Sequence, residues 1–416
     1  MKTVLVVEDS SFFGVMIKDK IKAETSFDAL WVQDMSEAVK VLNETGNSLF
    51  AAILDFNLPD APQGEIIDEV VDRDLPAIVY TSDLSEKVRD MVWSKNVADY
   101  ALKDDSRSLD YIISMLKRFE RNIGTKIMVV EDSHFFRKIL TDLLRVHCYK
   151  VFSAHNGMEA LDLLEEHPDM KLVVTDFSMP GMDGLALTQK IREKYDRNDL
   201  AIIGVSSEGD KLLAARFIKN GANDFIIKQS FLTEEFYCRV TQSIENLEHI
   251  QMVREAAIKD FLTGLNNRRY FFDEGSKFFM SAARDKQAIA CGMIDIDYFK
   301  KVNDTYGHEA GDVAICHISS ILRSSARETD IVARLGGEEF CILAVNMSAE
   351  DAGKIFEDIR GKVEKSPVDI DGQKIKITVS IGVATKPGNS LDGMVGEADR
   401  LLYDAKESGR NKVVMK

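Results

Sequence analysis

The stretch VLVVEDSSFF at residues 4–13 decides the fold, because it returns as IMVVEDSHFF at residues 127–136. Each copy is a short, mostly β-branched apolar run that ends at two adjacent carboxylates. This pattern is typical of a buried strand that runs into a loop. Self-similarity over such a distance predicts two related domains in tandem.

Three further apolar runs recur in both copies, and each also ends at a polar residue. They end at Asp55, Thr81 and Lys103 in the first copy and at Asp176, Ser206 and Lys228 in the second. Segments with helical periodicity, such as SEAVKVLNE and GMEALDLLEEH, lie between the runs. Alternating strands and helices predict a doubly wound α/β fold with a parallel sheet, in which functional groups gather at the carboxyl ends of the strands.

The polar residues at these strand ends favour phosphoryl chemistry. Three carboxylates at one sheet edge raise one another's pKa unless a cation joins them, and an oxygen-only cluster with open positions suits Mg²⁺. The acid that stands alone at the third strand's end can act as a nucleophile and form an acyl phosphate. The hydroxyl and the lysine can then hold the phosphoryl oxygens. Five such residues, repeated twice, are not explained as solvated loop positions.

Both copies resemble receiver domains of the response-regulator family, over residues 1–122 and 125–245. The resemblance implies a flavodoxin-like fold and phosphorylation of Asp55 and Asp176 by a histidine kinase or a phosphotransfer protein. It also implies two Mg²⁺ sites, in which the backbones of Asn57 and Ser178 assist the acids Glu8, Asp9, Glu131 and Asp132. The implied switch residues are Thr81, Lys103 and the aromatic Tyr100 in the first copy, and Ser206, Lys228 and Phe225 in the second.

The first copy departs from this pattern beside its phosphoacceptor. Its loop DFNLPDAPQG carries one extra residue, with Pro62 before Gly64, whereas the second copy keeps the usual Met179-Pro180 and Gly184. Asp176 is therefore the firmer assignment. The first copy can instead be an adaptor that packs without being phosphorylated.

A helix without Gly or Pro is expected over residues 236–258, where Val240, Ile244 and Leu247 recur at three- and four-residue spacing. One interpretation is the last helix of the second copy continuing into the next domain. The other adds a short coiled-coil dimer seam, although Gln251 and Arg254 fall where a strict heptad needs apolar residues.

Residues 255–416 share no repeat with the rest of the chain. The apolar strand IACGMI meets Asp295, and Gly336-Gly337-Glu338-Glu339 between two strand-like runs predicts a hairpin turn. A strand-end aspartate and turn glutamates can clamp a metal and a triphosphate, and a glutamate beside the metal can deprotonate an attacking hydroxyl. The cations that can offset phosphate charge are Lys300, Lys406 and Arg410. Asn303 and Asp312 match the hydrogen-bonding edge of guanine.

This segment resembles the GGDEF family of diguanylate cyclases through DFLTGLNNRR, DIDYFKKVNDTYGHEAGD, RLGGEEF, ITVSIGVA and ADRLLYDAKESGRN. The resemblance implies an α+β palm-like domain that condenses two GTP into cyclic di-GMP and two pyrophosphates, a nucleotidyltransferase reaction. It implies that Asp295, the Ile296 carbonyl and Glu338 bind Mg²⁺, with Mn²⁺ as an alternative, and that Glu338 and Glu339 are the catalytic glutamates. The implied nucleotide contacts are Asn303, His308 and Asp312 for guanosine, and Lys406 and Arg410 for phosphates.

The motif Arg327-Glu328-Thr329-Asp330 resembles the family's R-x-x-D site, at which the product binds and inhibits. An arginine can pair with phosphate or with a guanine edge, and an aspartate can accept from guanine. Because the product is built from two nucleotides, a homodimer is expected. A surface ion pair is the alternative explanation of R-x-x-D.

Composition excludes several classes. A formal net charge of −16 argues against nucleic-acid binding, and five scattered cysteines without a C-x-x-C pair favour a reducing cytoplasm. No signal peptide or apolar run long enough for a membrane span is recognisable. The competing functions are a non-catalytic sensor of cyclic di-GMP or GTP, a transcription-type response regulator, and a cyclase with a mononucleotide product. The intact acids argue against the sensor, and the absence of a helix-turn-helix pattern argues against the transcription regulator. The guanine-reading residues argue against the mononucleotide cyclase.

Overall fold

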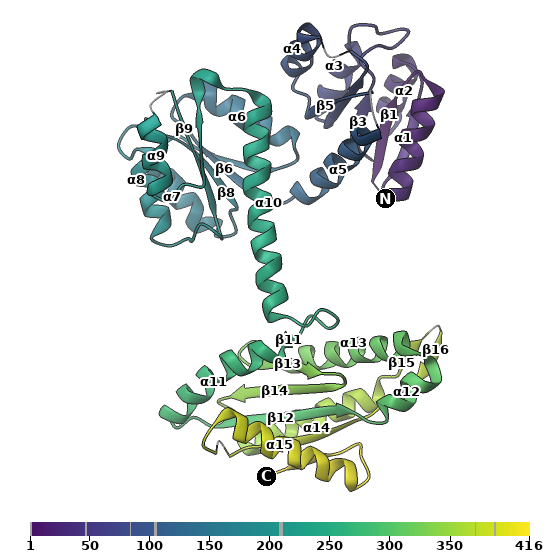
Figure 1. Cartoon of the computed structure of the whole chain (residues 1–416), viewed down its shortest axis with the longest axis vertical. Coiled ribbons are helices and arrows are strands. Elements are labelled where there is room, and N and C mark those ends of the chain that lie inside the picture. Colours follow the sequence, from purple (N-terminus) through teal and green to yellow (C-terminus); the bar gives the residue numbers. More distant parts are fainter. Residues whose placement is uncertain are drawn as a thin grey trace. The chain divides into compact units, whose positions relative to one another are not determined.

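The computed structural model describes residues 2–45, 48–83, 85–103, 106–207, 211–370, 372–386 and 388–416. The chain divides into two compact units, residues 1–249 and 250–416. The described residues form two five-stranded sheets in the first unit, and a six-stranded sheet with a separate two-stranded hairpin in the second (Figure 1). In the described part of the chain, no helix has both the length and the apolar composition needed to cross a bilayer.

The first sheet is parallel, with strand order β2-β1-β3-β4-β5. Apolar residues fill β1, β3 and β4 because helices cover both faces of the sheet, as parallel sheets require. The strands are β1 (Thr3–Val7), β2 (Asp28–Val32), β3 (Leu49–Leu54), β4 (Ala77–Thr81) and β5 (Asp99–Leu102). The helices are α1 (Ser11–Glu24), α2 (Met35–Thr45), α3 (Glu65–Val71), α4 (Glu86–Ser94) and α5 (Ser106–Asn122).

The second sheet repeats the first, with order β7-β6-β8-β9-β10 and parallel pairing throughout. Its strands are β6 (Lys126–Val130), β7 (Lys150–Ala154), β8 (Leu172–Asp176), β9 (Ala201–Ser206) and β10 (Asp224–Ile227). Its helices are α6 (His134–Val146), α7 (Gly157–Glu166), α8 (Gly184–Arg192), α9 (Lys211–Lys219), the short η2 (Lys228–Ser230) and α10 (Thr233–Ile258). The expected doubly wound α/β architecture is confirmed.

The apolar stripe of α10 belongs to the core of the second copy. Val240, Ile244 and Leu247 are all buried there, against β-strand residues such as Ile203. The stripe is therefore the inner face of the last helix of this copy and not the seam of a coiled coil. Met252 and Val253, farther along α10, are exposed.

The two copies of the first unit are joined by a buried polar contact. His147, which ends α6, donates from Nε2 to the carbonyl of Ala98 at 2.9 Å. Asn122 of α5 donates to the His147 carbonyl at 2.8 Å, and Arg118 of α5 pairs with Glu248 of α10 at 2.7 Å. Burial lowers the pKa of His147 to about 3, so its ring is neutral at ordinary pH.

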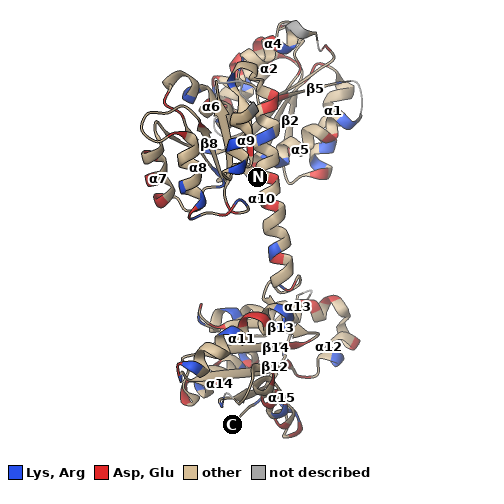
Figure 2. Cartoon of the chain, turned by 60° about the vertical axis from the view of Figure 1, so that its left-hand side comes forward, with Lys and Arg blue, Asp and Glu red and all other residues tan. Residues whose placement is uncertain are grey.

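The third sheet is mixed, with order β11-β13-β14-β12-β17-β18. Its strands are β11 (Asn266–Asn267), β12 (Ile289–Ile296), β13 (Ile331–Gly336), β14 (Glu339–Val345), β17 (Val379–Ala384) and β18 (Val413–Met415), and β15 (Val368–Ile370) and β16 (Gln373–Ile375) form a separate hairpin. The helices are α11 (Arg268–Arg284), α12 (Phe299–Tyr306), α13 (His308–Ser325), α14 (Ala349–Lys365) and α15 (Leu391–Glu407). Figure 2 shows acidic and basic residues interspersed on the helices of both units.

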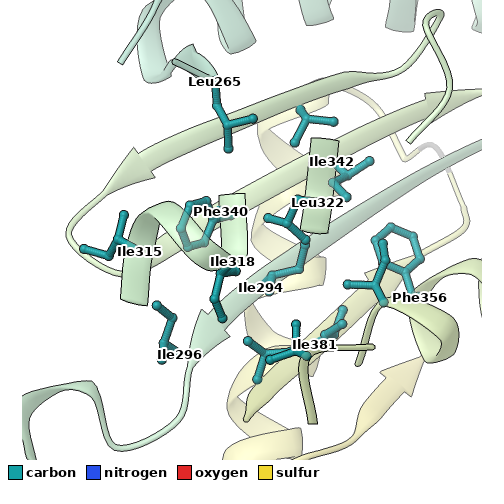
Figure 3. Packing of buried hydrophobic residues seen from close by; sticks show 14 of the residues in the cluster. Leu265, Ile294, Ile296, Ile315, Ile318, Leu322, Phe340, Ile342, Phe356 and Ile381 are labelled. Atoms are coloured by element: carbon teal, nitrogen blue, oxygen red, sulfur yellow. The ribbon is translucent and has the colours of Figure 1, made fainter. Parts of the chain in front are cut away.

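One face of this sheet packs on α13 and α14. Figure 3 shows Phe340 and Ile294 from the sheet facing Ile318 and Leu322 of α13, with Phe356 of α14 beside them. All five are buried, and a fully buried side chain of this size contributes about 1.5–3 kcal/mol. This core holds β12 and β14 in a fixed register, and the functional side chains project from their ends.

Candidate active site and receiver sites

The site in the second unit begins at the end of β12. This strand is buried throughout its length between β14 and β17; Asp295 pairs with both neighbours, and Ile296 pairs with β17. Asp295 is 4% exposed and accepts the Lys406 ammonium of α15 at 2.8 Å. Burial raises the pKa of Asp295 to about 6, against the lowering effect of Lys406, and Glu338 and Glu339 add to the rise.

The Gly-Gly-Glu-Glu segment forms the predicted hairpin between β13 and β14, which pair antiparallel. Gly337 has φ of 49°, a left-handed conformation that glycine adopts without strain, and the register shifts between Arg334 and Gly336. Glu339 lies directly opposite Asp295 in the pairing of β14 with β12. The turn glutamates and the strand-end aspartate therefore meet at one sheet edge.

Two residues that the sequence did not single out as site residues hold this turn. Arg334 donates from Nε to the Gly337 carbonyl at 2.9 Å and pairs with Asp260 at 3.1 Å. Both side chains are largely buried. Burial raises the pKa of Asp260, but hydrogen bonds from Thr263 and from Arg334 outweigh it, so the pKa is lowered. The motifs DFLTGL and RLGGEEF contain these residues, but their contact across 74 positions is visible only in the tertiary structure.

The candidate phosphate ligands are on two elements. Lys406 lies in the last turn of α15, and Arg410 follows in the turn that ends it, where its guanidinium stands 4.7 Å from the centre of the Tyr298 ring. Lys300 is exposed on α12. Lys406 is thus already beside Asp295, whereas Lys300 extends into solvent.

The candidate guanine ligands are on α12 and α13, which pack together. Asn303 of α12 has a buried Oδ1 that accepts no hydrogen bond, and it lies against Gly311 of α13. A buried oxygen without a donor is costly, so it is suited to a donor from a ligand. Asp312 is next to Gly311 and exposed, as is His308 at the start of α13.

Arg327 and Asp330 form a tight turn before β13. The Arg327 N–H donates to Asp330 Oδ2 at 2.9 Å, and the Asp330 N–H donates to the Arg327 carbonyl at 3.0 Å. Asp330 Oδ1 is buried and accepts no hydrogen bond, and burial raises the pKa of this carboxyl. The Arg327 side chain is exposed. Both hydrogen bonds use the Arg327 backbone, so the contact seen between these two residues is a turn and not a side-chain ion pair.

Each parallel sheet of the first unit carries an acidic cluster at its carboxyl edge. Ligand oxygens of Glu131, Asp132 and Asp176 lie within 4.8 Å of one another, as do those of Glu8, Asp9 and Asp55. Such oxygen-only sets fit Mg²⁺. Burial raises the pKa of both Glu8 and Glu131, against the lowering effect of the nearby lysines.

A lysine closes each cluster. The Lys228 ammonium lies 2.7 Å from Glu131 and 2.8 Å from Asp176, and the Lys103 ammonium lies 2.7 Å from both Glu8 and Asp55. The remaining receiver candidates stand around the same edges. Thr81 and Ser206 are buried at strand ends, Phe225 is buried, Tyr100 is half-buried, and Asn57 and Ser178 are exposed in the following loops.

The extra residue in the loop of the first copy is accommodated in a turn that lies away from Asp55. Leu58 and Ala61 exchange two backbone hydrogen bonds of 3.1 and 3.2 Å in a local turn, and both are buried. Gly64 then takes φ of 71°, and its N–H donates to the Phe56 carbonyl, as that of Gly184 does to Phe177. The two acid–lysine clusters are consequently alike in spite of the different loops.

Comparison with known proteins identifies two regions of the chain. Residues 127–236 match the response regulator receiver domain family, and residues 257–412 match the family described as diguanylate cyclase, GGDEF domain. The response regulator PleD of Caulobacter vibrioides is 28% identical over 355 residues, covering 80% of this chain and 75% of PleD.

Two further similarities have higher identity. The diguanylate cyclase VdcA of Vibrio cholerae is 34% identical over 276 residues, covering 64% of this chain and 80% of VdcA. A solved structure described as a two-component system response regulator/GGDEF domain protein is 35% identical with a TM-score of 0.53, covering 60% of this chain and 100% of that one. With a receiver domain, a GGDEF domain and a relative of this identity covered over four fifths of its length, the chain belongs to the GGDEF family of diguanylate cyclases.

Proposed function

We propose that this diguanylate cyclase is controlled by phosphorylation of two receiver domains and works as a homodimer that cyclic di-GMP inhibits. The proposed receivers span residues 1–122 and 125–245, the linking helix residues 236–258, and the cyclase domain residues 255–416. The single observation that carries the proposal is the edge at which Asp295 pairs with Lys406 opposite Glu339 and beside the glycine turn.

The cyclase site is suited to a divalent metal. Asp295, the Ile296 carbonyl and Glu338 would hold Mg²⁺ or Mn²⁺ through oxygen atoms, the donor type that these ions prefer. When bound, the ion neutralises charge on the triphosphate and polarises the reacting phosphate. Lys406, freed from Asp295, binds phosphate oxygens together with Arg410 and Lys300. Glu339, or Glu338, accepts the proton of the attacking ribose hydroxyl, while pyrophosphate leaves from the other GTP.

Guanine is read by Asn303 and Asp312, with His308 beside the guanosine. The buried Asn303 oxygen that accepts no protein hydrogen bond supports this role, because guanine offers donors at its edge. The same argument supports product inhibition at Arg327 and Asp330, since Asp330 also keeps a buried acceptor oxygen without a donor. These two sites bind the same base by the same chemistry.

The receivers would act through dimerisation. A histidine kinase or phosphotransfer protein would phosphorylate Asp176, and Asp55 as well, adding about −1.5 to −2 charge at the lysine-closed cluster. Displacement of Lys228 toward the phosphoryl group shifts the surface around Ser206 and Phe225. Tethering two GTP-loaded cyclase domains then raises their effective concentration. The exposed Met252 and Val253 of α10 support a seam beyond the receiver core.

Conversion of GTP with Mg²⁺ to cyclic di-GMP, with and without a small phosphodonor, tests this proposal. We expect product from the wild type, loss of about 100-fold or more in Glu338→Ala, and loss of donor stimulation in Asp176→Asn. Asp55→Asn is the matched variant of the first receiver, and Glu350→Ala is the matched control for removal of an exposed glutamate.

The outcomes separate the alternatives. If Asp55→Asn keeps full donor stimulation, the first receiver is an adaptor. A wild type that binds cyclic di-GMP tightly but makes none under any condition would instead be a sensor. If the phosphorylated protein stays monomeric and is fully active, the dimer part of the proposal is wrong.

A further inference from the structure

The turn after α15 is held in an unusual backbone conformation. Gly409, Arg410 and Asn411 have φ values of 112°, 60° and 48°, three successive positive values of which two belong to residues with side chains. Side-chain-bearing residues adopt this region only where the surroundings impose it. The Arg410 N–H donates to the Ala405 carbonyl at 3.0 Å, which joins the turn to the end of the helix.

Asp297, two positions after the metal-site aspartate, anchors this turn from the sheet. It is 4% exposed, and its carboxylate accepts from Thr378 Oγ1 at 2.7 Å, from Ser380 Oγ at 2.6 Å and from the Asn411 backbone N–H at 3.0 Å. The Asn411 side chain is held in addition by Arg360 and Glu364, each at 2.9 Å. The backbone on the C-terminal side of Arg410 is thereby fixed to the end of β12.

Tyr298 holds the other end of Arg410. This residue also has positive φ, 57°, and it is 63% exposed, so burial does not explain where its ring lies. The Arg410 guanidinium lies 4.7 Å from the ring centre, within the range of a cation–π contact. An exposed arginine side chain otherwise has several rotatable bonds, so its guanidinium has no fixed direction in water.

From these contacts we infer that Asp297 and Tyr298 are positioning residues for Arg410. Asp297 fixes the backbone of the arginine turn, and Tyr298 orients the guanidinium toward the triphosphate beside Asp295 and Lys406. The inference rests on the proposed role of Arg410 as a phosphate ligand. Neither residue touches the reacting atoms, so each acts on nucleotide affinity through Arg410.

Binding of a non-hydrolysable GTP analogue and of GMP to the full-length protein tests the inference. We expect Tyr298→Ala to weaken binding of the triphosphate about threefold to fivefold, because the cation–π contact is lost, while GMP binding is unchanged. Tyr298→Phe, which keeps the aromatic face, should restore the wild-type affinity. Tyr403→Ala is the matched control, because Tyr403 on α15 is also 63% exposed.

Combining the variants with Arg410→Ala tests whether Tyr298 affects triphosphate binding through Arg410. Arg410→Ala should weaken triphosphate binding roughly tenfold or more, and Tyr298→Ala should add nothing in that background. Asp297→Asn should resemble Tyr298→Ala in sparing GMP. If the Asp297 variant does not fold, which its melting temperature reports, the Tyr298 variants decide.

Two failures are distinguishable. Wild-type triphosphate affinity in Arg410→Ala would refute the proposed role of Arg410 itself. If Arg410→Ala weakens triphosphate binding as expected, three results would refute the positioning inference alone. Tyr298→Ala could bind the triphosphate like the wild type, or Tyr298→Phe could bind it as weakly as Tyr298→Ala. The third result is that Tyr298→Ala still weakens binding when Arg410 is already replaced by alanine. Equal weakening of GMP and the triphosphate in Tyr298→Ala would show a general structural role and overturn the inference as well.

Discussion

Single side chains set the chemistry of the cyclase site through burial. Asp295 has little contact with water, so its charged form depends on Lys406 or on a metal. Asn303 and Asp330 keep buried oxygens without donors, which is unfavourable until a ligand supplies them. In the proposed function, these residues are ready to bind ligands, and the free protein is less stable for it.

The raised pKa of Asp295 predicts pH-dependent metal binding. Below pH 6 a proton occupies the carboxylate and competes with the ion, so the affinity should fall about tenfold per pH unit, whereas above pH 6 it should level off. The measurement is Mn²⁺ binding to nucleotide-free protein between pH 5 and 7.5. The same titration of Asp295→Asn is subtracted, which removes the contribution of Mn²⁺ bound at the receiver sites. A difference that does not change with pH would contradict this prediction.

Gly311 allows Asn303 to take its position. An added Cβ would stand 1.9 Å from Asn303 Oδ1, so Gly311→Ala should turn the amide away and weaken GTP binding roughly tenfold. Gly361→Ala is the control, because this helical glycine has open space around it and alanine favours the helix by about 1 kcal/mol. Equal GTP affinity in the two variants, measured by titration calorimetry, would show that Asn303 does not read the base.

Whole elements explain how the first unit is assembled. The apolar stripe of α10 packs against the sheet of the second copy. The two copies contact each other through residues at the ends of α5 and α6. His147 makes this contact as a neutral donor, and Phe119 and Tyr237 pack against its ring. A protonated imidazole is incompatible with this environment.

The depressed pKa of His147 predicts loss of stability in mild acid. The unfolded chain takes up a proton below about pH 6.5, while the folded state does so only near 3, so the contribution is complete above 6.5 and declines as pH falls between these values. From pH 7 to 5 the loss should be about 2 kcal/mol. His147→Gln, which keeps a donor for Ala98, should remove this component.

Fluorescence isolates the unit concerned, because the two tryptophans, Trp31 and Trp93, both lie within residues 1–249. Urea unfolding followed by tryptophan emission at pH 7 and pH 5 gives the difference. His134→Gln, at an exposed position at the start of α6, is the control. The prediction fails if the His147 and His134 variants lose equal stability between the two pH values.

At the scale of the whole molecule, the proposed homodimer makes activity depend on how two chains meet. Val253 of α10 is 70% exposed, beyond the part of the helix that the receiver core buries. In a dimer seam, a charge at this position would be buried without a partner, which is strongly unfavourable. We expect Val253→Glu to raise, by about tenfold or more, the protein concentration that is needed for phosphodonor-stimulated activity.

Analytical ultracentrifugation and activity over a range of protein concentrations check this prediction, with GTP-analogue binding expected to be unchanged. Met280→Glu adds the same charge at an exposed apolar position on α11 and should behave like the wild type. An unaltered concentration dependence in Val253→Glu would exclude α10 from the dimer contact.

The sequence by itself determined the repeat, the parallel sheets and the cyclase motifs. Strand-end acids such as Asp55, Asp176 and Asp295 follow apolar runs directly, and local periodicity is visible without a structure. Contacts between distant segments were not predictable. Arg334 meets Asp260 across 74 positions, and Asn411 meets Asp297 across 114.

The interpretation of the α10 stripe shows the same limit, because an apolar face is equally compatible with a sheet and with a partner helix until packing is known. Tertiary structure decided which partner each side chain has, since burial and hydrogen bonding depend on neighbours that the order of residues does not specify.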